Sequence, residues 1–361
     1  DLKDKGAEAY FTTMHSLWRF LWKGSDEYET IQRALAMAEK SGQPFAIFFN
    51  KAYLAVLERW RGNPRRAKEL LEGSADFLQS QFNIRYANYL NLFSAWNLTE
   101  LGRYNEAIPY LNQGLDIAEK NSLHFFICRY YNSLGWTYSE FYSLQKAVRF
   151  NNQALEKIVA MKKSPAMVYI VGEIRAMTEV NIIENEVEMG KIDDAWKHII
   201  RLEEEVDNPN FDFNRDRWSI RMKDLKGVIL LKRGDLDGAE EIARHYLDVG
   251  AKRKYKKYSG RAERLFGRTL IERGACDLAE TKLMQALAKL EEVENPKQLW
   301  LTHIALAKLH EKMNRHDLER KHWQEAASII KSTADDLEDK ELRTTFIDAK
   351  PVREILENVN R

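Results

Sequence analysis

Apolar residues recur at three- and four-residue spacing along almost the whole chain, in segments of about 16–20 residues. One example is Leu225, Val228 and Ile229, which precede Gly234. This spacing places the apolar side chains on one face of an amphipathic helix. Alternating apolar and polar runs are short, and the turn signals of β-hairpins are missing. The pattern therefore predicts an all-α fold.

Proline and glycine mark the predicted helix boundaries. Pro44, Pro64, Pro165 and Pro296 each stand at an expected first helical position, three of them behind a residue that caps helices well. Glycines fall where one helix should end and the next begin. We expect helical pairs at about 6–22/26–41, 44–61/64–81, 83–101/105–121, 123–141/144–162, 165–189/192–206, 214–233/236–249, 254–273/276–293 and 296–313/316–335.

A fixed frame repeats through the chain, with a glycine followed five residues later by an alanine. It occurs at Gly62/Ala67, Gly102/Ala107, Gly190/Ala195, Gly234/Ala239 and Gly274/Ala279. Gly62 and Gly102 are 40 residues apart, Gly190 and Gly234 are 44 apart, and Gly234 and Gly274 are 40 apart. A period of this size indicates stacked helical hairpins. We therefore predict a single α-solenoid over residues 1–361, with the best candidate for a bend at 206–217 and a C-terminal cap at 336–361 formed by one helix at about 338–359.

The small and aromatic positions of these hairpins resemble the tetratricopeptide repeat (TPR). In the fourth pair the matching residues are Tyr131, Leu134, Gly135, Tyr138, Ala147 and Ala154. The resemblance implies a right-handed superhelix of about eight hairpins whose first helices line a concave groove. The period is nearer 40 residues than the usual 34, and Glu319 replaces the expected alanine of the last hairpin. Such long repeats resemble the TPR regions of bacterial signalling ATPases and cyclases, which implies a regulatory module outside this chain, and the chain begins at Asp1 rather than Met.

Composition removes several other classes of protein. The formal net charge is +1, so the chain as a whole has no attraction for nucleic acid or anionic membrane. No apolar stretch is long enough to span a membrane. Cys128 and Cys276 lie almost four repeats apart, too far to be bridged in a solenoid, and we expect reduced thiols in a cytoplasmic protein.

Catalytic and metal-binding patterns are missing from the sequence. There is no phosphate-binding GxxxxGK[ST] loop, no GxSxG and no HExxH. His303, His310, His316 and His322 share the last repeat, but their spacings of 7, 6 and 6 do not place two ligands on one helix face. We expect ordinary surface or packing histidines, no metal, no cofactor and no enzyme activity.

Two groups of residues are candidates for partner binding, because the TPR resemblance places them on the inner face. A basic run from Lys252 to Tyr258 continues to further cations, and it suits an acidic peptide, nucleic acid or a solvated loop. Large aromatics with an amide and a guanidinium gather in the third and fourth pairs, where they either anchor a peptide or seal the packing. The predicted contacts are Tyr89, Trp96, Arg129, Asn132, Trp136, Arg221, Arg261, Arg264, Arg268 and Lys308.

These residues lead to a functional expectation with alternatives. The first is a protein-interaction scaffold or sensor that holds a peptide or protein segment in its groove. The second is a small-ligand sensor, which requires a deep, closed pocket. The third is an RNA-binding solenoid, which requires a continuous basic strip; Glu184 and Glu188 should face the same groove and interrupt it.

Overall fold

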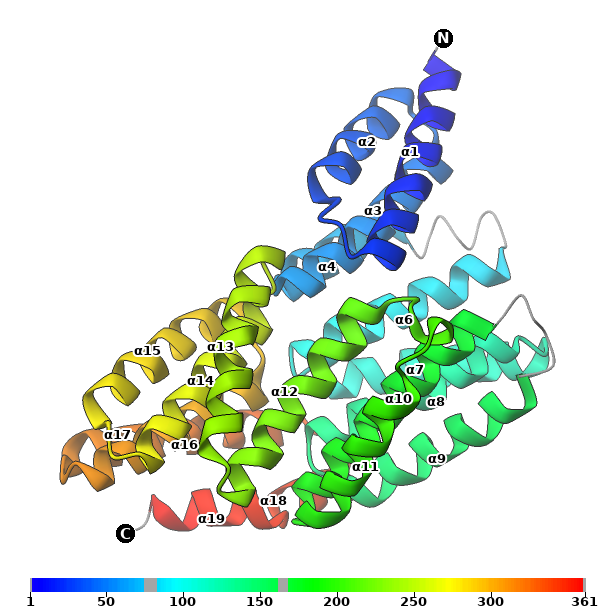
Figure 1. Ribbon diagram of the computed structural model, residues 1–361. Helices are drawn as coiled ribbons and strands as arrows, with labels where there is room; N and C mark the ends of the chain where they lie inside the picture. Colours follow the sequence, from blue (N-terminus) through cyan, green and yellow to red (C-terminus); the bar gives the residue numbers. More distant parts are fainter. Residues whose placement is uncertain (1, 75–82, 162–167, 360–361) are drawn as a thin grey trace.

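The protein is an all-α solenoid, as the sequence predicts (Figure 1). The computed structural model describes residues 2–74, 83–161 and 168–359. Within these ranges the helices follow one another as antiparallel hairpins, with one short 3₁₀ helix at Pro209–Phe211. The α-helices are α1 (Leu2–Lys23), α2 (Tyr28–Ser41), α3 (Pro44–Arg61), α4 (Pro64–Leu71), α6 (Ile84–Glu100), α7 (Tyr104–Lys120), α8 (His124–Glu140), α9 (Leu144–Met161), α10 (Val168–Glu188), α11 (Ile192–Glu205), α12 (Arg215–Arg233), α13 (Leu236–Arg253), α14 (Lys256–Glu272), α15 (Cys276–Val293), α16 (Pro296–Lys312), α17 (His316–Asp335), α18 (Lys340–Ile347) and α19 (Lys350–Asn358).

The repeated glycines end the first helix of a hairpin for a conformational reason. Gly62, Gly102, Gly190, Gly234 and Gly274 all have φ between 72° and 86°. This left-handed region costs glycine no steric penalty, and it closes a helix C-terminus. The repeated glycines in the sequence therefore mark the C-terminal ends of the first helices.

The prolines also stand where predicted, although their caps differ. Pro44, Pro64 and Pro296 begin α3, α4 and α16. The Asn295 side chain caps α16 by accepting a hydrogen bond from the Gln298 backbone nitrogen at 3.0 Å. Asn63 makes no side-chain cap. Ser164 and Pro165 lie outside the described residues, as do the end of the second predicted pair and the start of the fifth.

The C-terminal segment contains two helices instead of the single one expected. The predicted span at 338–359 runs through Pro351, which lies in the first turn of α19. Proline is tolerated in a first turn and breaks a helix interior, so the chain turns at Asp348 and starts again. Phe346 of α18 then packs against Trp300, with ring centroids 5.7 Å apart, and shields the last hairpin.

Small residues let the helices of a hairpin approach closely. A Cβ atom on Gly267 of α14 would lie 2.7 Å from Cγ of Leu283 on α15. Leu283 is fully buried, as is Ala279 one turn earlier. This is the packing that the TPR resemblance implies for these positions, and a side chain at 267 would force the two helices apart.

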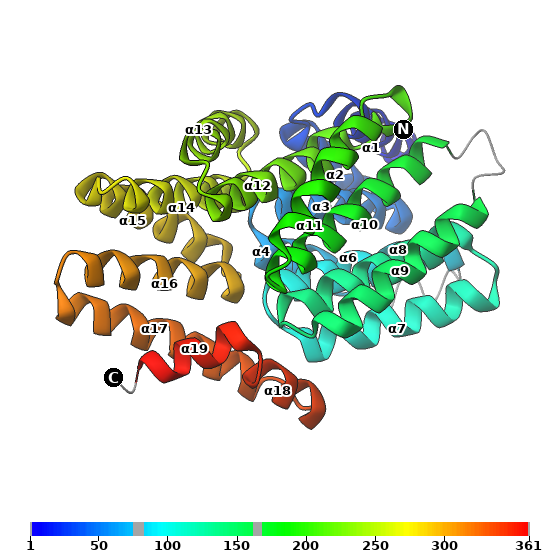
Figure 2. The same ribbon diagram turned by 60° about the horizontal axis from the view of Figure 1, so that its bottom comes forward.

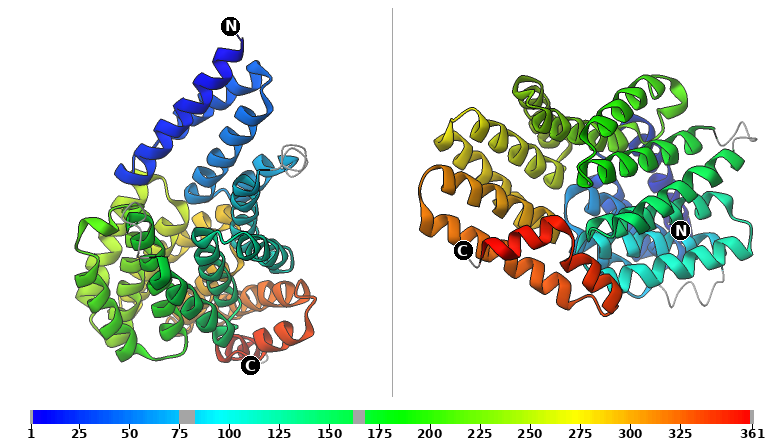
Figure 3. Two further views of the ribbon diagram at one scale, coloured as in Figure 1. Left: turned by 90° about the vertical axis from the view of Figure 1, so that its right-hand side faces the viewer. Right: turned by 90° about the horizontal axis from the view of Figure 1, so that it is seen from below.

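The solenoid winds round until its last hairpins meet the second, third and fourth (Figures 2 and 3). Lys256 at the start of α14 donates to Asn63 beside α4, over a separation of 193 residues. Lys297 on α16 donates to the Ser139 carbonyl oxygen of α8 at 3.1 Å. Asn105 on α7 bonds to the backbone of Asp336 and Glu338 next to α18. These contacts close the concave face into a ring, and the first helices point inward.

Candidate functional site

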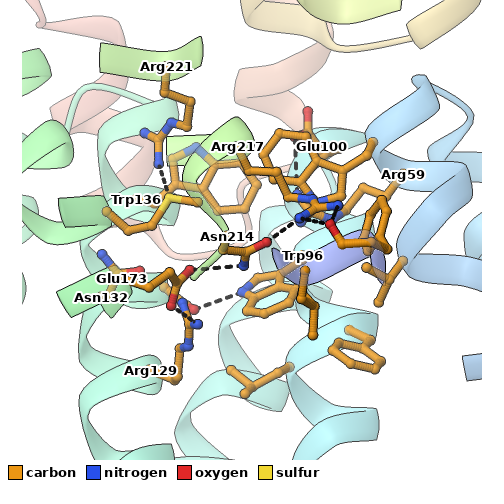
Figure 4. A pocket seen from close by; sticks show the side chains of 18 of the residues that line it. Arg59, Trp96, Glu100, Arg129, Asn132, Trp136, Glu173, Asn214, Arg217 and Arg221 are labelled. Atoms are coloured by element: carbon orange, nitrogen blue, oxygen red, sulfur yellow. Dashed lines mark hydrogen bonds and ion pairs between the residues drawn. The ribbon is translucent and has the colours of Figure 1, made fainter. Parts of the chain in front are cut away.

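A cavity of about 240 Å³ lies at the centre of this ring (Figure 4). Its walls come from α1, α3, α6, α8, α10, α12 and α14. Each of these helices lies one repeat beyond the one before it in the sequence, and they converge because each is the first helix of its hairpin. The cavity is thus a product of the superhelix and not of any single repeat.

Seven of the ten predicted contact residues line this one cavity. They are Tyr89, Trp96, Arg129, Asn132, Trp136, Arg221 and Arg261. From the repeat positions we expect the aromatic group, with Trp96 and Trp136, at one end of the groove and the basic group, with Arg261, Arg264 and Arg268, at the other. The ring closure instead brings Trp136 and Arg261 into the walls of the same cavity. Their contact with a partner stays a prediction.

Arg264, Arg268 and Lys308 do not line the cavity. The Arg264 guanidinium is buried between α14 and α16, where it donates to the Gln298 carbonyl and side-chain oxygens and to Thr302. Arg268 is half-buried and Lys308 is exposed. The hydrogen bonds of Arg264 join two repeats, which gives this residue a packing role beside its predicted binding role.

Aromatic side chains form one wall of the cavity. The rings of Tyr53, Phe93 and Trp96 follow one another, with centroids 6.0 Å and 5.5 Å apart. The indole nitrogen of Trp96 donates to Ser133 at 2.8 Å. The indole nitrogen of Trp136 donates to Glu140 at 3.1 Å. These hydrogen bonds fix the two tryptophans, and both side chains line the cavity.

A carboxylate at the end of α6 gathers cations from distant repeats. Lys257 of α14 donates to Glu100 at 2.7 Å, although 157 residues separate them. Arg59 of α3 lies 3.7 Å from the same carboxylate, and Asn295 donates to it at 3.2 Å. Burial disfavours ionisation here, but Lys257 and Arg59 lower the pKa of Glu100. Glu100 therefore remains ionised and holds the ring closed.

A second carboxylate joins the fifth, sixth and seventh repeats. Glu184 of α10 pairs with Arg221 of α12 at 3.3 Å and with Arg261 of α14 at 3.6 Å. Arg261 also pairs with Asp224 at 2.5 Å. Burial opposes ionisation, yet Arg261 and Arg221 lower the pKa of Glu184 to about 2. Glu184 faces the groove as expected and interrupts the basic strip.

A third polar chain connects α8, α10, α12 and the N-terminal hairpin (Figure 4). Arg129 pairs with Glu173. Glu173 accepts a hydrogen bond from Asn214 at 3.2 Å, and Asn214 accepts one from Arg217. Asn214 has φ of 60°, and its backbone nitrogen donates to the Leu21 carbonyl at 2.8 Å. The stretch predicted to be irregular thus fastens α1 to the ring; whether it bends stays a prediction.

Sequence reasoning missed several residues of the cavity. Arg59, Trp60, Glu100, Glu173 and Arg217 line it, and none of them was selected. A usable signal existed for Arg217, which precedes Arg221 by one helical turn on the same face of α12. The carboxylates gave no such signal, because their partners lie in other repeats.

The basic run contains residues in quite different surroundings. Lys257 is buried against Glu100, whereas Lys252 is exposed and pairs with Asp248. Arg253 pairs with Asp216 at 2.8 Å and Lys256 with Glu292 at 2.7 Å. The cations named here are thus engaged within the molecule.

Three of the four clustered histidines pack on one another. His303 and His322 lie with their Nδ1 atoms 3.0 Å apart, and the rings of His310 and His322 stack at 5.4 Å. Burial, with the neighbouring His303 and His310, lowers the pKa of His322 to about 4. His316 is exposed. Among the residues that the structure describes, no group of three or more histidine, cysteine, aspartate or glutamate side chains has a geometry suited to a metal ion.

Comparison with known proteins identifies the class of fold. Residues 90–121 match the family model of the tetratricopeptide repeat. The solved structure of a Rap protein complexed with competence and sporulation factor is similar, with a TM-score of 0.59 and 12% identity, over 98% of this chain and 99% of that one. The apo form of RapI gives a TM-score of 0.55 and 16% identity over 80% and 99%.

These matches define a solenoid of tetratricopeptide type, in agreement with the resemblance read from the sequence. A signal transduction ATPase with a tetratricopeptide repeat sensor from Pyrococcus horikoshii matches over 93% of this chain and 55% of that one. Its TM-score of 0.46 and identity of 13% are too low to bear on function. No curated protein matches the sequence. No helix in the described ranges has the length and apolar character needed to cross a membrane.

Proposed function

We propose that the chain is a non-catalytic binding module of a cytoplasmic signalling system, and that it captures a peptide or protein segment on its concave face. The observation that carries this proposal is the cavity, to which the first helices of seven hairpins contribute. Tryptophan, tyrosine and arginine dominate binding hot spots, and these residue types are prominent in its walls. One anchor side chain of the partner would enter the cavity, and the rest would lie along the ring.

The charge of the walls supports an acidic partner. Lining cations are Arg59, Arg129, Arg217, Arg221, Lys257 and Arg261, against the carboxylates Glu100, Glu140, Glu173 and Glu184. The same carboxylates disfavour nucleic acid, because they break the basic strip that a phosphate backbone would follow. The similar structure of a Rap protein with competence and sporulation factor supports ligand uptake by a solenoid of this shape.

A second candidate function is the sensing of a small ligand. The size of the cavity favours it, since about 240 Å³ exceeds the roughly 150 Å³ of an engineered apolar cavity that binds benzene. Binding of such a ligand would stabilise the closed ring, and an attached module would respond to the closure.

Selection of displayed random peptides on the immobilised chain tests the first proposal. We expect enriched peptides with an acidic group next to an aromatic residue. The double variant Trp96→Ala/Trp136→Ala should weaken their binding at least tenfold and keep its helicity. Trp18→Ala is the matched control, because this tryptophan is 50% exposed on α1 and outside the cavity. Failure to enrich any peptide, or equal binding by the double variant, would contradict peptide capture.

A further inference from the structure

One cation of the cavity has no carboxylate partner in the described part of the chain. Arg217 is 1% exposed, and its guanidinium donates to the Phe20 carbonyl oxygen at 3.2 and 3.3 Å and to the Asn214 side chain. Among the described residues its Nε has no hydrogen-bond partner. The carboxylates that partly offset the effect of burial on its pKa, Asp216 and Glu173, pair instead with Arg253 and Arg129. The Phe20 ring lies over the guanidinium, with its centroid 3.2 Å from the central carbon. A buried charge is costly without a counterion, so a guanidinium in a cavity wall that forms no ion pair with the described residues indicates a place for an anion.

A second guanidinium lies against the same indole ring. The guanidinium carbons of Arg59 and Arg217 are 5.1 and 5.6 Å from the centroid of Trp60. The carboxylate nearest to Arg59 is Glu100, which is 3.7 Å away and bonds more closely to Lys257. The Nε of Arg59 also lacks a partner among the described residues. Burial lowers the pKa of both arginines, because removal from water disfavours the charged form.

An aromatic surface begins directly beside these donors. Arg59 lies between two indoles, because its guanidinium carbon is also 5.1 Å from the centroid of Trp96. Trp96 continues to Phe93, whose ring centroid is 5.7 Å from that of Tyr89. The volume of about 240 Å³ limits the occupant to a small ring system. The cavity therefore combines two guanidinium groups, each with an Nε that has no hydrogen-bond partner among the described residues, with a flat apolar wall.

We propose that the cavity recognises a small aromatic group that carries one carboxylate, with the carboxylate on Arg217 and Arg59 and the ring against Trp96 and Phe93. Planar guanidinium groups match carboxylates in geometry, and their hydrogen bonds to an ionised acceptor are about twice as strong as neutral ones. The group could be a free aromatic acid or the aromatic end of a peptide. This inference rests on the proposed binding function and specifies its chemistry.

Matched probes test this inference on the chain as it stands. Calorimetric titration with N-acetyltryptophan and with its uncharged amide should show binding of the acid at least tenfold tighter than that of the amide. Arg217→Met should lower the affinity for the acid to that for the amide, and it should leave the affinity for the amide unchanged. Arg233→Met is the control, since Arg233 ends the same helix and pairs with Asp193 outside the cavity. Thermal unfolding of each variant verifies that it is folded.

Equal affinity for acid and amide would overturn the inference. Failure of both probes to bind, while displayed peptides still bind, would also overturn it and would leave the proposed function standing. If Arg217→Met does not fold, Arg217→Lys should keep part of the preference for the acid, and an unaltered preference would again count against the carboxylate site. Synthetic peptides with free and amidated C-termini then separate the two sources, because amidation weakens binding only if the peptide end supplies the carboxylate.

Discussion

His198 shows how a single side chain can depend on two helices at once. It lies on α11 between two carboxylates of α10, with Nε2 2.6 Å from Glu179 and Nδ1 3.2 Å from Glu186. Its side chain is only 11% exposed. Burial disfavours its charged form, but the hydrogen bonds to Glu179 and Glu186 raise the pKa of His198 to about 9. The imidazolium therefore links the fifth hairpin at neutral pH.

This pKa leads to a pH dependence of definite sign. The folded-state pKa is above the ordinary value of 6.5, so the contribution of His198 is complete below pH 6.5 and is lost as the pH rises to about 9. After allowance for solvent screening we expect the wild type to lose about 1–2 kcal/mol more than His198→Gln over this window. Urea unfolding at several pH values measures the difference. The exposed His316→Gln is the control, and parallel curves for wild type and His198→Gln would refute the prediction.

At the scale of an element, Asn295 joins the start of α16 to two earlier repeats. Its side-chain oxygen caps α16, while its amide donates to the Glu100 carbonyl at 3.0 Å. The residue is fully buried, so no water can replace these bonds. A sequence motif that indicates only a local helix start thus also serves the closure of the ring.

Asn295→Ala should cost about 2 kcal/mol of unfolding free energy, since it removes a cap and leaves a buried acceptor unpaired. Asn83→Ala provides the comparison. Asn83 caps α6 with bonds to the nitrogens of Arg85 and Tyr86, and its side chain is exposed. Asn83→Ala should lower the free energy of unfolding by only about 1 kcal/mol. Equal losses in chemical denaturation would show that the long-range bonds of Asn295 add nothing.

The fold was readable from the sequence because its signals are local. Gly102 has to adopt positive φ at a helix end, and Ala107 has to be small where two helices touch, so both mark the repeat directly. Tyr89, Trp96 and Trp136 could be placed in the cavity for the same reason, as positions within a repeat. The bond between Lys257 and Glu100 follows no local pattern, because it depends on how many repeats complete the ring. The lysine was therefore grouped with a solvated basic run.

At the scale of the whole molecule, the closed ring depends on charges that meet across its ends. Lys257, Glu100 and Asn295 form the buried part of this contact, and Arg65 pairs with Glu294 on its exposed side. The contact joins α14 and α16 to α3, α4 and α6, which are otherwise separated by the full circuit of the chain. Lys257 and Glu100 also line the cavity, so this contact forms part of its wall.

Lys257→Glu should open the ring, because it places another carboxylate beside Glu100 and Glu140. Loss of the cation from a buried pair costs about 3–5 kcal/mol. We expect a larger radius of gyration in small-angle X-ray scattering and unchanged helicity by circular dichroism. Lys252→Glu, at an exposed site nearby, should leave the scattering as in the wild type. If the scattering profile of Lys257→Glu matches that of the wild type, apolar packing alone maintains the ring.

Arg217 has a mechanical consequence for the N-terminal hairpin, which extends beyond the ring in Figure 1. The same guanidinium that faces the cavity also holds the last turn of α1 through the Phe20 carbonyl. A ligand that binds this guanidinium would compete with the Phe20 carbonyl of α1 for its N–H donors. Binding in the cavity would therefore loosen the attachment of the N-terminal hairpin. The α1–α2 hairpin would then change its tilt. Ligand binding inside the solenoid would thus move a surface that a neighbouring domain can contact.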